Sequence, residues 1–67
     1  MSVARVTEIT SASTVGVEDA VKKGVERANE TLDNIKSVWV QDINCKVENG
    51  SISEWLVNMK VTFVLKD

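Results

Sequence analysis

Two alternating stretches in the second half of the chain dominate its pattern of apolar and polar residues. Positions 55, 57, 59, 61, 63 and 65 are all apolar, and most positions between them are polar. This period of two predicts a strand with one buried face and one wetter face. Asn49-Gly50 separates it from a second such stretch, and Asn-Gly favours a tight turn whose two central residues both need positive φ. We therefore predict a β-hairpin over Ser37–Lys66 that turns at Glu48–Ser51.

Without a bulge, this hairpin pairs residues whose numbers sum to 99, and a bulge would shift part of the pairing. Val40 then faces Met59, and Val38 faces Val61, on the buried face. The predicted pairs on the opposite face are Trp39–Lys60, Gln41–Asn58, Ile43–Leu56 and Cys45–Glu54. Asp42 and Asn44 share the parity of the buried face but are polar, which predicts that burial ends near them. A tryptophan and aliphatic residues gathered on the wetter face indicate a partner or a ligand there.

The first half of the chain predicts a strand and a helix. Val3–Ile9 has the composition of a strand, although its periodicity is imperfect. Thr10–Thr14 is expected to be a polar connection in which Ser13 or Thr14 caps the helix. Val15 to about Asn34 predicts a helix, because apolar residues recur there at spacings of three and four, opposite a charged, solvated face. Gly24 lies on the apolar stripe, where it would allow close approach to a strand or to another chain.

These elements predict an α+β fold in the order β-α-β-β, with a three-stranded antiparallel sheet wrapped around one helix. We expect one domain over residues 1–67. A chain of 67 residues buries only about 60% of its unfolded surface, and it has a single cysteine and no histidine for a disulfide or a common metal site. Oligomerisation is the remaining support for so small a fold. We therefore expect a homo-oligomer whose contacts cover the outer side of the sheet.

Charge and composition exclude several classes of function. The net charge is −2, and the eight basic residues are scattered, which speaks against nucleic-acid binding. No stretch resembles a signal peptide or approaches the roughly 18 apolar residues of a membrane span. The lone thiol is in keeping with a cytoplasmic protein. No histidine, nucleophile–base spacing or Gly-rich phosphate loop is present, so we expect no enzymatic activity.

Several short motifs in this order resemble the dodecins, a family of small flavin-binding proteins. The motifs are Val17–Ala20, Arg27-Ala28 followed by Thr31-Leu32, Val47–Gly50 and Met59–Phe63. The resemblance covers almost the whole chain without gaps. It implies a hollow homododecamer that stores a flavin (riboflavin, FMN or FAD) in pockets between subunits. In the flavin-binding members a tryptophan stacks on the flavin and a glutamine holds its edge.

The resemblance also identifies where this chain departs from that pattern. The tryptophan of the family falls on Ser37, its glutamine on Leu56, and its Arg-Gly pair on Asn44-Cys45. Serine offers almost no stacking surface, and leucine offers no side-chain hydrogen bond.

Trp39 lies two residues beyond Ser37, about 6.6 Å along the strand at ~3.3 Å per residue. It could stack a planar ligand in a shifted pocket, with Gln41 or Asn58 supplying an amide. The alternative is that Trp39, Ile43 and Leu56 form a subunit contact. The candidate ligand-binding residues are Trp39, Ser37, Leu56, Gln41 and Asn58.

Two hypotheses of function follow. The first is a storage protein that sequesters a planar ligand, with flavin as the family default. The second is a structural dodecameric shell without flavin that binds metal ions such as calcium through acidic residues of several chains.

Cys45 is expected to be a structural, unreactive cysteine. The only basic residue next to it is Lys46, whose side chain should point to the other face of the strand. Trp55 is expected in the core or an interface, since it shares the parity of Val57.

Overall fold

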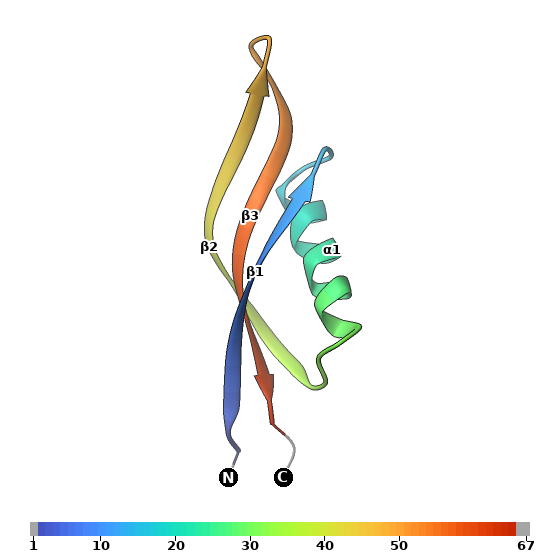
Figure 1. Ribbon diagram of the computed structural model, residues 1–67, viewed down its shortest axis with the longest axis vertical. Coiled ribbons are helices and arrows are strands. Elements are labelled where there is room, and N and C mark those ends of the chain that lie inside the picture. The colour runs from blue at the N-terminus through green and yellow to red at the C-terminus, as the bar shows by residue number, and fades with distance from the viewer. Residues whose placement is uncertain (1, 66–67) are drawn as a thin grey trace.

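The computed structural model describes residues 2–65. Its elements follow the order β1 (Ala4–Ser13), α1 (Val17–Asn29), β2 (Ile35–Glu48) and β3 (Ser51–Val64). The three strands form one antiparallel sheet in the order β1-β3-β2, and α1 lies along one side of it (Figure 1). This confirms the predicted α+β fold and its β-α-β-β order.

The sheet has two distinct faces, because paired residues of antiparallel strands point to the same side. We call the face toward α1 the inner face. In β3 it carries Trp55, Val57, Met59, Val61 and Phe63. The opposite, outer face carries Leu56, Asn58, Lys60 and Thr62.

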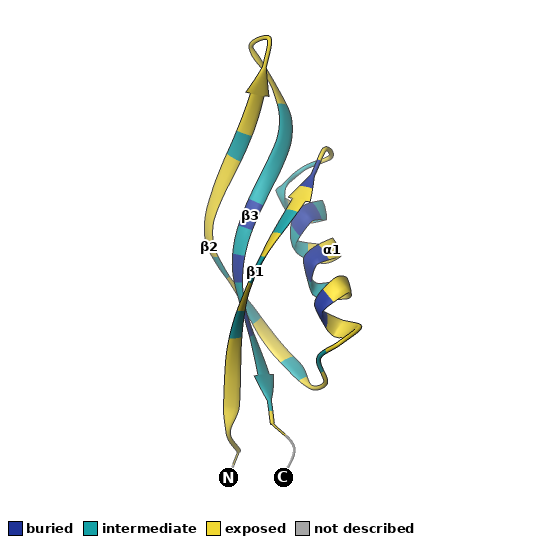
Figure 2. Ribbon diagram, viewed as in Figure 1, coloured by how far each residue is buried: buried dark blue, intermediate teal, exposed yellow. Residues whose placement is uncertain are grey.

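The core is small and lies between α1 and the middle of β3. Ala20, Val57 and Met59 form its centre, and partly buried residues surround them, namely Ile9, Val17, Val21, Val38 and Val40. Figure 2 shows buried residues along one side of α1 and at the centre of β3, whereas the hairpin end is exposed. The predicted burial of one face of the last strand is therefore confirmed for its middle. The last residue of the predicted strand, Lys66, lies outside the described residues.

Gly24 lets the helix approach the sheet closely. A Cβ atom placed on Gly24 would collide with the terminal methyl group of Met59 and would lie 3.1 Å from the Cβ of Ser11. The small Ser11 on β1 and the missing side chain on α1 therefore meet at one point. Of the two alternatives for this glycine, close approach to a strand is the one observed.

The first strand is longer than predicted. β1 continues through Thr10 to Ser13, and these four residues pair in turn with residues 58 to 55 of β3. The expected polar connection over Thr10–Thr14 is therefore wrong for its first four residues. Small and polar side chains remain in the strand here because one face is exposed and the other must leave room for α1.

The helix is shorter than predicted at both ends. It begins after Gly16, whose φ of 166° is extended. Ser13 does not cap it in the predicted way: its Oγ accepts hydrogen bonds from the backbone N–H groups of Val15 (2.9 Å) and Gly16 (3.2 Å) and so holds them in a turn. The helix ends at Asn29, and the backbone N–H of Leu32 still donates to the carbonyl of Ala28 at 2.9 Å. Asn34, which has a φ of 60°, then turns the chain into β2.

The hairpin turn is confirmed, whereas part of its register is wrong. Asn49 and Gly50 have φ values of 52° and 78°, and Glu48 pairs with Ser51. Val40–Met59, Val38–Val61 and Trp39–Lys60 pair as predicted. Between them the register shifts by one residue, and the observed pairs are Asp42–Asn58, Ile43–Val57, Asn44–Leu56, Cys45–Trp55 and Lys46–Glu54.

Two compensating bulges cause this shift. Gln41 is an extra residue in β2, and Ser53 is an extra residue in β3. Between the bulges, Ile43 and Cys45 lie on the inner face and Asp42 and Asn44 on the outer face, which reverses the prediction for all four. The bulge thus keeps polar residues off the inner face. The apolar parity of β2, which changes from Val38 and Val40 to Ile43 and Cys45, was the sequence signal for it.

Candidate functional site

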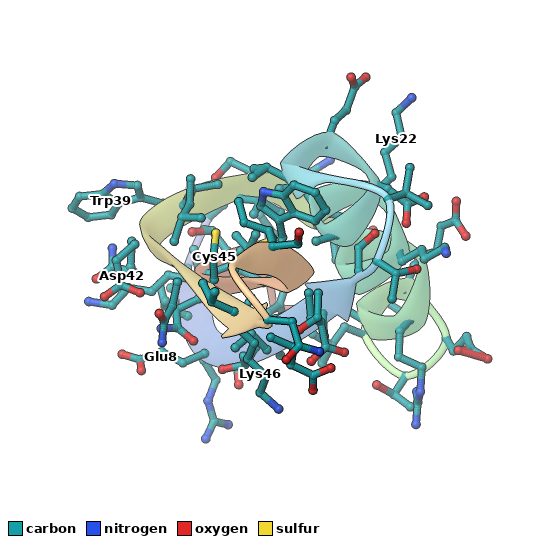
Figure 3. All side chains as sticks on the ribbon, turned by 90° about the horizontal axis from the view of Figure 1, so that it is seen from above. Glu8, Lys22, Trp39, Asp42, Cys45 and Lys46 are labelled. Atoms are coloured by element: carbon teal, nitrogen blue, oxygen red, sulfur yellow. The ribbon has the colours of Figure 1, made fainter. Side chains whose placement is uncertain are left out.

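Trp39 is the largest exposed apolar side chain on the outer face, and three strands fix its position. β2 places it opposite Lys60 of β3, and β1 places Glu8 on the far side of Lys60. The residue is 67% exposed. In Figure 3, Trp39, Asp42 and Glu8 project from the side of the sheet that faces away from α1. Lys22, which belongs to α1, lies on the other side. Within one chain the indole is therefore open to a ligand or to another subunit.

Lys60 lies between the indole and a carboxylate. Its Nζ atom is 5.7 Å from the centre of the Trp39 ring and 3.9 Å from Oε1 of Glu8. An ammonium group at that distance from an indole is attracted to the negative face of the ring. Lys60 therefore has two weak, exposed partners, and a ligand that covers the ring would compete with one of them.

The next row of the outer face carries a short hydrogen-bond chain. The hydroxyl group of Thr10 donates to Oδ1 of Asn58 at 2.6 Å, and Nδ2 of Asn58 donates to Oδ1 of Asp42 at 2.5 Å. The three residues come from three different strands. They orient the amide of Asn58 beside the Trp39 row and satisfy one of its donors and its acceptor.

A shallow hollow lies over this row. It has a volume of about 390 Å³, and its polar lining comes from Glu8, Thr10, Gln41, Asp42 and Asn58. The bulge at Gln41 is what brings both Gln41 and Asp42 to it. The outer face thus combines an aromatic surface with amide, hydroxyl and carboxylate groups one row away.

Only some of the predicted site residues lie close together in the structure. Trp39 and Asn58 occupy adjacent rows of the outer face, with Gln41 at the bulge between them. Ser37 is opposite Thr62, and Leu56 is opposite Asn44. These two rows are six residues apart on β3, about 20 Å at ~3.3 Å per residue. Ser37 and Leu56 therefore share the predicted face but lie at opposite ends of it, and they could meet only between subunits.

Sequence reasoning missed four outer-face residues of this region, Glu8, Thr10, Asp42 and Lys60. Asp42 was missed because the bulge was not placed. Glu8 and Thr10 were missed because no pairing partner was assigned to the first strand. Lys60 was correctly paired with Trp39, and its positive charge opposite an indole was the signal for a cation–π contact.

The remaining candidates lie elsewhere. Cys45 is half-buried on the inner face opposite Trp55, away from the outer-face hollow.

Near the start of α1, Ser13 Oγ donates to Oδ2 of Asp19 at 2.6 Å. This bond and the adjacent Lys23 ammonium hold the pKa of Asp19 below its usual value. Residues 2–65 contain no group of three or more His, Cys, Asp or Glu side chains that could hold a metal ion within one chain.

A second hollow of about 600 Å³ runs between α1 and β1. Its lining includes Lys23, Arg27 and Leu32 from the helix side and Thr7 and Ile9 from the strand. The two cations already pair with nearby carboxylates, Lys23 with Asp19 at 3.0 Å and Arg27 with Glu30 at 3.6 Å.

In the part of the chain that the structure describes, no helix is long and apolar enough to cross a bilayer.

Comparisons with known proteins agree on one family. The family model described as Dodecin matches residues 3–66. The dodecin from Streptomyces davaonensis is 36% identical, with a TM-score of 0.94 over 98% of this chain and 97% of that one. A point mutant of the Thermus thermophilus dodecin is 25% identical, with a TM-score of 0.95 over 100% of both chains. The calcium dodecin of Mycobacterium tuberculosis, described as having a novel calcium-binding site, is 26% identical, with a TM-score of 0.82 over 96% and 91%. A search of curated proteins finds no match.

Proposed function

The chain belongs to the dodecin family, and from this premise we propose that it forms a homododecamer that stores a small planar ligand on the Trp39 side of its sheet. Dodecins are small oligomeric ligand-binding proteins and are known for binding and storage rather than for enzymatic activity. Flavin is the ligand we propose first. The mechanism is stacking and burial, without turnover. We also place the protein in the cytoplasm, in keeping with the free thiol of Cys45.

The observation that carries this proposal is the exposed indole beside oriented polar groups. A flat heteroaromatic ring needs one apolar face for contact and hydrogen-bonding groups at its edge. Trp39 offers the face, and Asn58 and Gln41 offer amides one row away. At the positions where the dodecin pattern has its tryptophan and glutamine, Ser37 and Leu56 offer neither, so Trp39 takes over the stacking role in this proposal.

Exposed apolar residues support the oligomer. Within residues 2–65 only five hydrophobic residues are buried, which is little for an independent fold. Other apolar side chains remain open at both ends of the sheet and along the hairpin, namely Val6, Ile43, Val47 and Ile52. Contacts between subunits would bury such residues and would also cover the second face of a ligand stacked on Trp39.

Riboflavin titration of the purified oligomer tests the proposal. Flavin fluorescence should fall on binding, because a stacked indole quenches it, and the mass of the same sample should correspond to twelve subunits. The variant Trp55→Phe leaves Trp39 as the sole tryptophan, and its own emission should fall with the same midpoint. Trp39→Phe leaves only Trp55 on the inner face, whose emission should change little. Equal quenching of both variants, or quenching of neither, would refute the proposed location.

Restoring the family residues provides a second test. The double variant Ser37→Trp, Leu56→Gln should raise riboflavin affinity if the family's pocket geometry is retained between subunits. Lys36→Trp, Leu56→Gln is a matched control that places the new indole one residue away. No gain in the double variant over this control would show that the pocket geometry differs from that of the family.

The second candidate, a shell that binds calcium and no flavin, is favoured by the loss of the tryptophan and glutamine at positions 37 and 56. It also has a structural relative described as a calcium dodecin. A calcium site would need carboxylates from more than one chain, since the described part of one chain holds no suitable group. A dodecamer that leaves riboflavin fluorescence unchanged, and whose melting temperature rises with calcium, would support this candidate instead.

A further inference from the structure

We propose that Lys60 makes the outer-face site selective for planar ligands that carry an anionic group, such as a phosphate or a carboxylate, over neutral planar ligands. This inference rests on the proposed function, since it concerns the same Trp39 surface. It goes beyond it by naming the charge of the ligand and the residue that selects it.

The geometry places one ammonium group over the indole that would stack on a ligand. Lys60 Nζ is 5.7 Å from the centre of the Trp39 ring, within the range in which a cation is attracted to an indole. The pairing Trp39–Lys60 is set by the register of β2 and β3, so the two side chains leave the sheet from directly opposite positions on the same face. A ligand stacked on Trp39 therefore brings its substituents within reach of this ammonium group.

The present partner of Lys60 is weak enough to be replaced. The Glu8 carboxylate is 3.9 Å from Nζ, at the outer limit of an ion pair, and its side chain is 75% exposed. Exposed pairs of this kind contribute little. A phosphate that binds next to the ring can take the place of Glu8, and it brings more charge and more acceptor oxygens.

The other charges near the site also favour exchange at this lysine. Oδ1 of Asp42 already accepts a hydrogen bond from the amide of Asn58, and the Glu8 carboxylate on β1 faces Lys60. If Lys60 were neutral, these two carboxylates would leave the region negative and would repel an anion. The selectivity thus depends on one side chain, and its removal should abolish or reverse the preference while a neutral ligand still binds.

A matched pair of flavins tests the inference in the intact oligomer. Riboflavin and flavin mononucleotide share the planar ring and differ by the phosphate. We expect flavin mononucleotide to bind roughly two- to five-fold more tightly at low salt, as for one exposed charge pair. This ratio should fall toward one as ionic strength rises. Equal affinities at low salt would overturn the inference and leave the proposed function intact.

Substitutions at Lys60 and Glu8 test whether Lys60 causes the preference for flavin mononucleotide. Lys60→Met should bring the ratio of the two affinities to one or below, while riboflavin binding persists. Lys60→Arg should keep the preference, and Glu8→Gln should enlarge it, because the competing carboxylate is gone. Lys46→Met is the matched control, since Lys46 is also an outer-face lysine paired with a glutamate, Glu54 at 3.5 Å. A Lys60→Met protein that keeps the wild-type ratio would overturn the inference, whereas absence of binding by both flavins in the wild type would overturn the proposed function itself.

Discussion

The two faces of β3 differ in how completely one chain determines them. On the inner face, Val57, Met59 and Val61 are at most 1% exposed and pack against α1 or its neighbours. On the outer face, Asn58, Lys60 and Thr62 remain half-buried, and the Trp39 indole beside them is open. Folding of a single chain therefore buries the inner face, whereas the outer face stays accessible within one chain. We expect substitutions on the inner face to change stability, and those on the outer face to change binding.

The largest difference should appear on truncating one side chain on each face of β3. Met59→Ala removes a fully buried side chain and leaves a cavity, so we expect a loss of about 2–5 kcal/mol in the free energy of unfolding. Thr62→Ala on the outer face should cost less than about 1 kcal/mol. Denaturant unfolding at one fixed protein concentration measures both, because subunit association contributes to apparent stability. Similar losses for the two variants would show that the faces do not differ in this way.

The second prediction adds a methyl group to α1 where the helix meets the inner face. Gly24→Ala improves helix propensity but puts a methyl group against Met59 and Ser11, and we expect a net loss of about 1–3 kcal/mol from overpacking. Gly16→Ala is the control, since nothing lies within 4 Å of its Cβ position. Combining Gly24→Ala with Met59→Val should recover part of the loss, since the shorter side chain leaves room for the new methyl group. A stabilised Gly24→Ala protein would show that helix propensity outweighs the contact.

The third prediction concerns Ser13, the buried end of the inner face of β1. Ser13→Ala removes the acceptor for the backbone N–H groups of Val15 and Gly16, and we expect a loss of about 1 kcal/mol. The variant also removes the hydrogen bond that is the main cause of the lowered pKa of Asp19. A lowered pKa stabilises the fold above the unfolded-state pKa, and this contribution is lost as pH falls below it through the folded-state pKa.

The wild type should therefore lose this contribution at pH values below about 3.8, the ordinary pKa of aspartate. Ser13→Ala should show a shallower decline over the same range. Melting temperatures measured from pH 2 to pH 6 compare the two proteins, and Thr14→Ala serves as a control at the neighbouring position. Parallel declines in wild type and Ser13→Ala would contradict the role of this hydrogen bond.

The sequence predicted the two faces of β3 correctly from Trp55 to Thr62, whereas it reversed the side-chain directions of Asp42 to Cys45 in β2. Alternation in the last strand and Asn49-Gly50 were sufficient for the hairpin, because burial imposes a strict period of two and the turn imposes positive φ. The bulge at Gln41 was not predicted, because one extra residue costs little locally and leaves only a change of apolar parity between Val40 and Ile43. The length of β1 was not predicted either, since Ser11 is small where it meets Gly24 of α1 and Ser13 is polar where its hydroxyl group holds the turn.

The candidate site was less predictable for the same physical reason. Trp39 and Asn58 were placed on the correct face, but the row that joins them depends on the bulge and on the pairing of Thr10, a residue expected in a loop. Outer-face residues obey no burial rule within one chain, so their pattern contains little information about the fold. Their grouping became visible only from the register of all three strands.

The smallest effect is expected for the hydrogen-bond chain of the outer face. Thr10→Val removes the donor to Asn58 but keeps a residue that suits a strand, and the bond is exposed to water. We therefore expect the free energy of unfolding to change by less than about 0.5 kcal/mol. The same denaturant titration measures it, with Thr7→Val on the inner face of β1 as the comparison. A loss above about 1 kcal/mol for Thr10→Val would mean that the outer face contributes to folding as the inner face does, and that its polar groups are not reserved for binding.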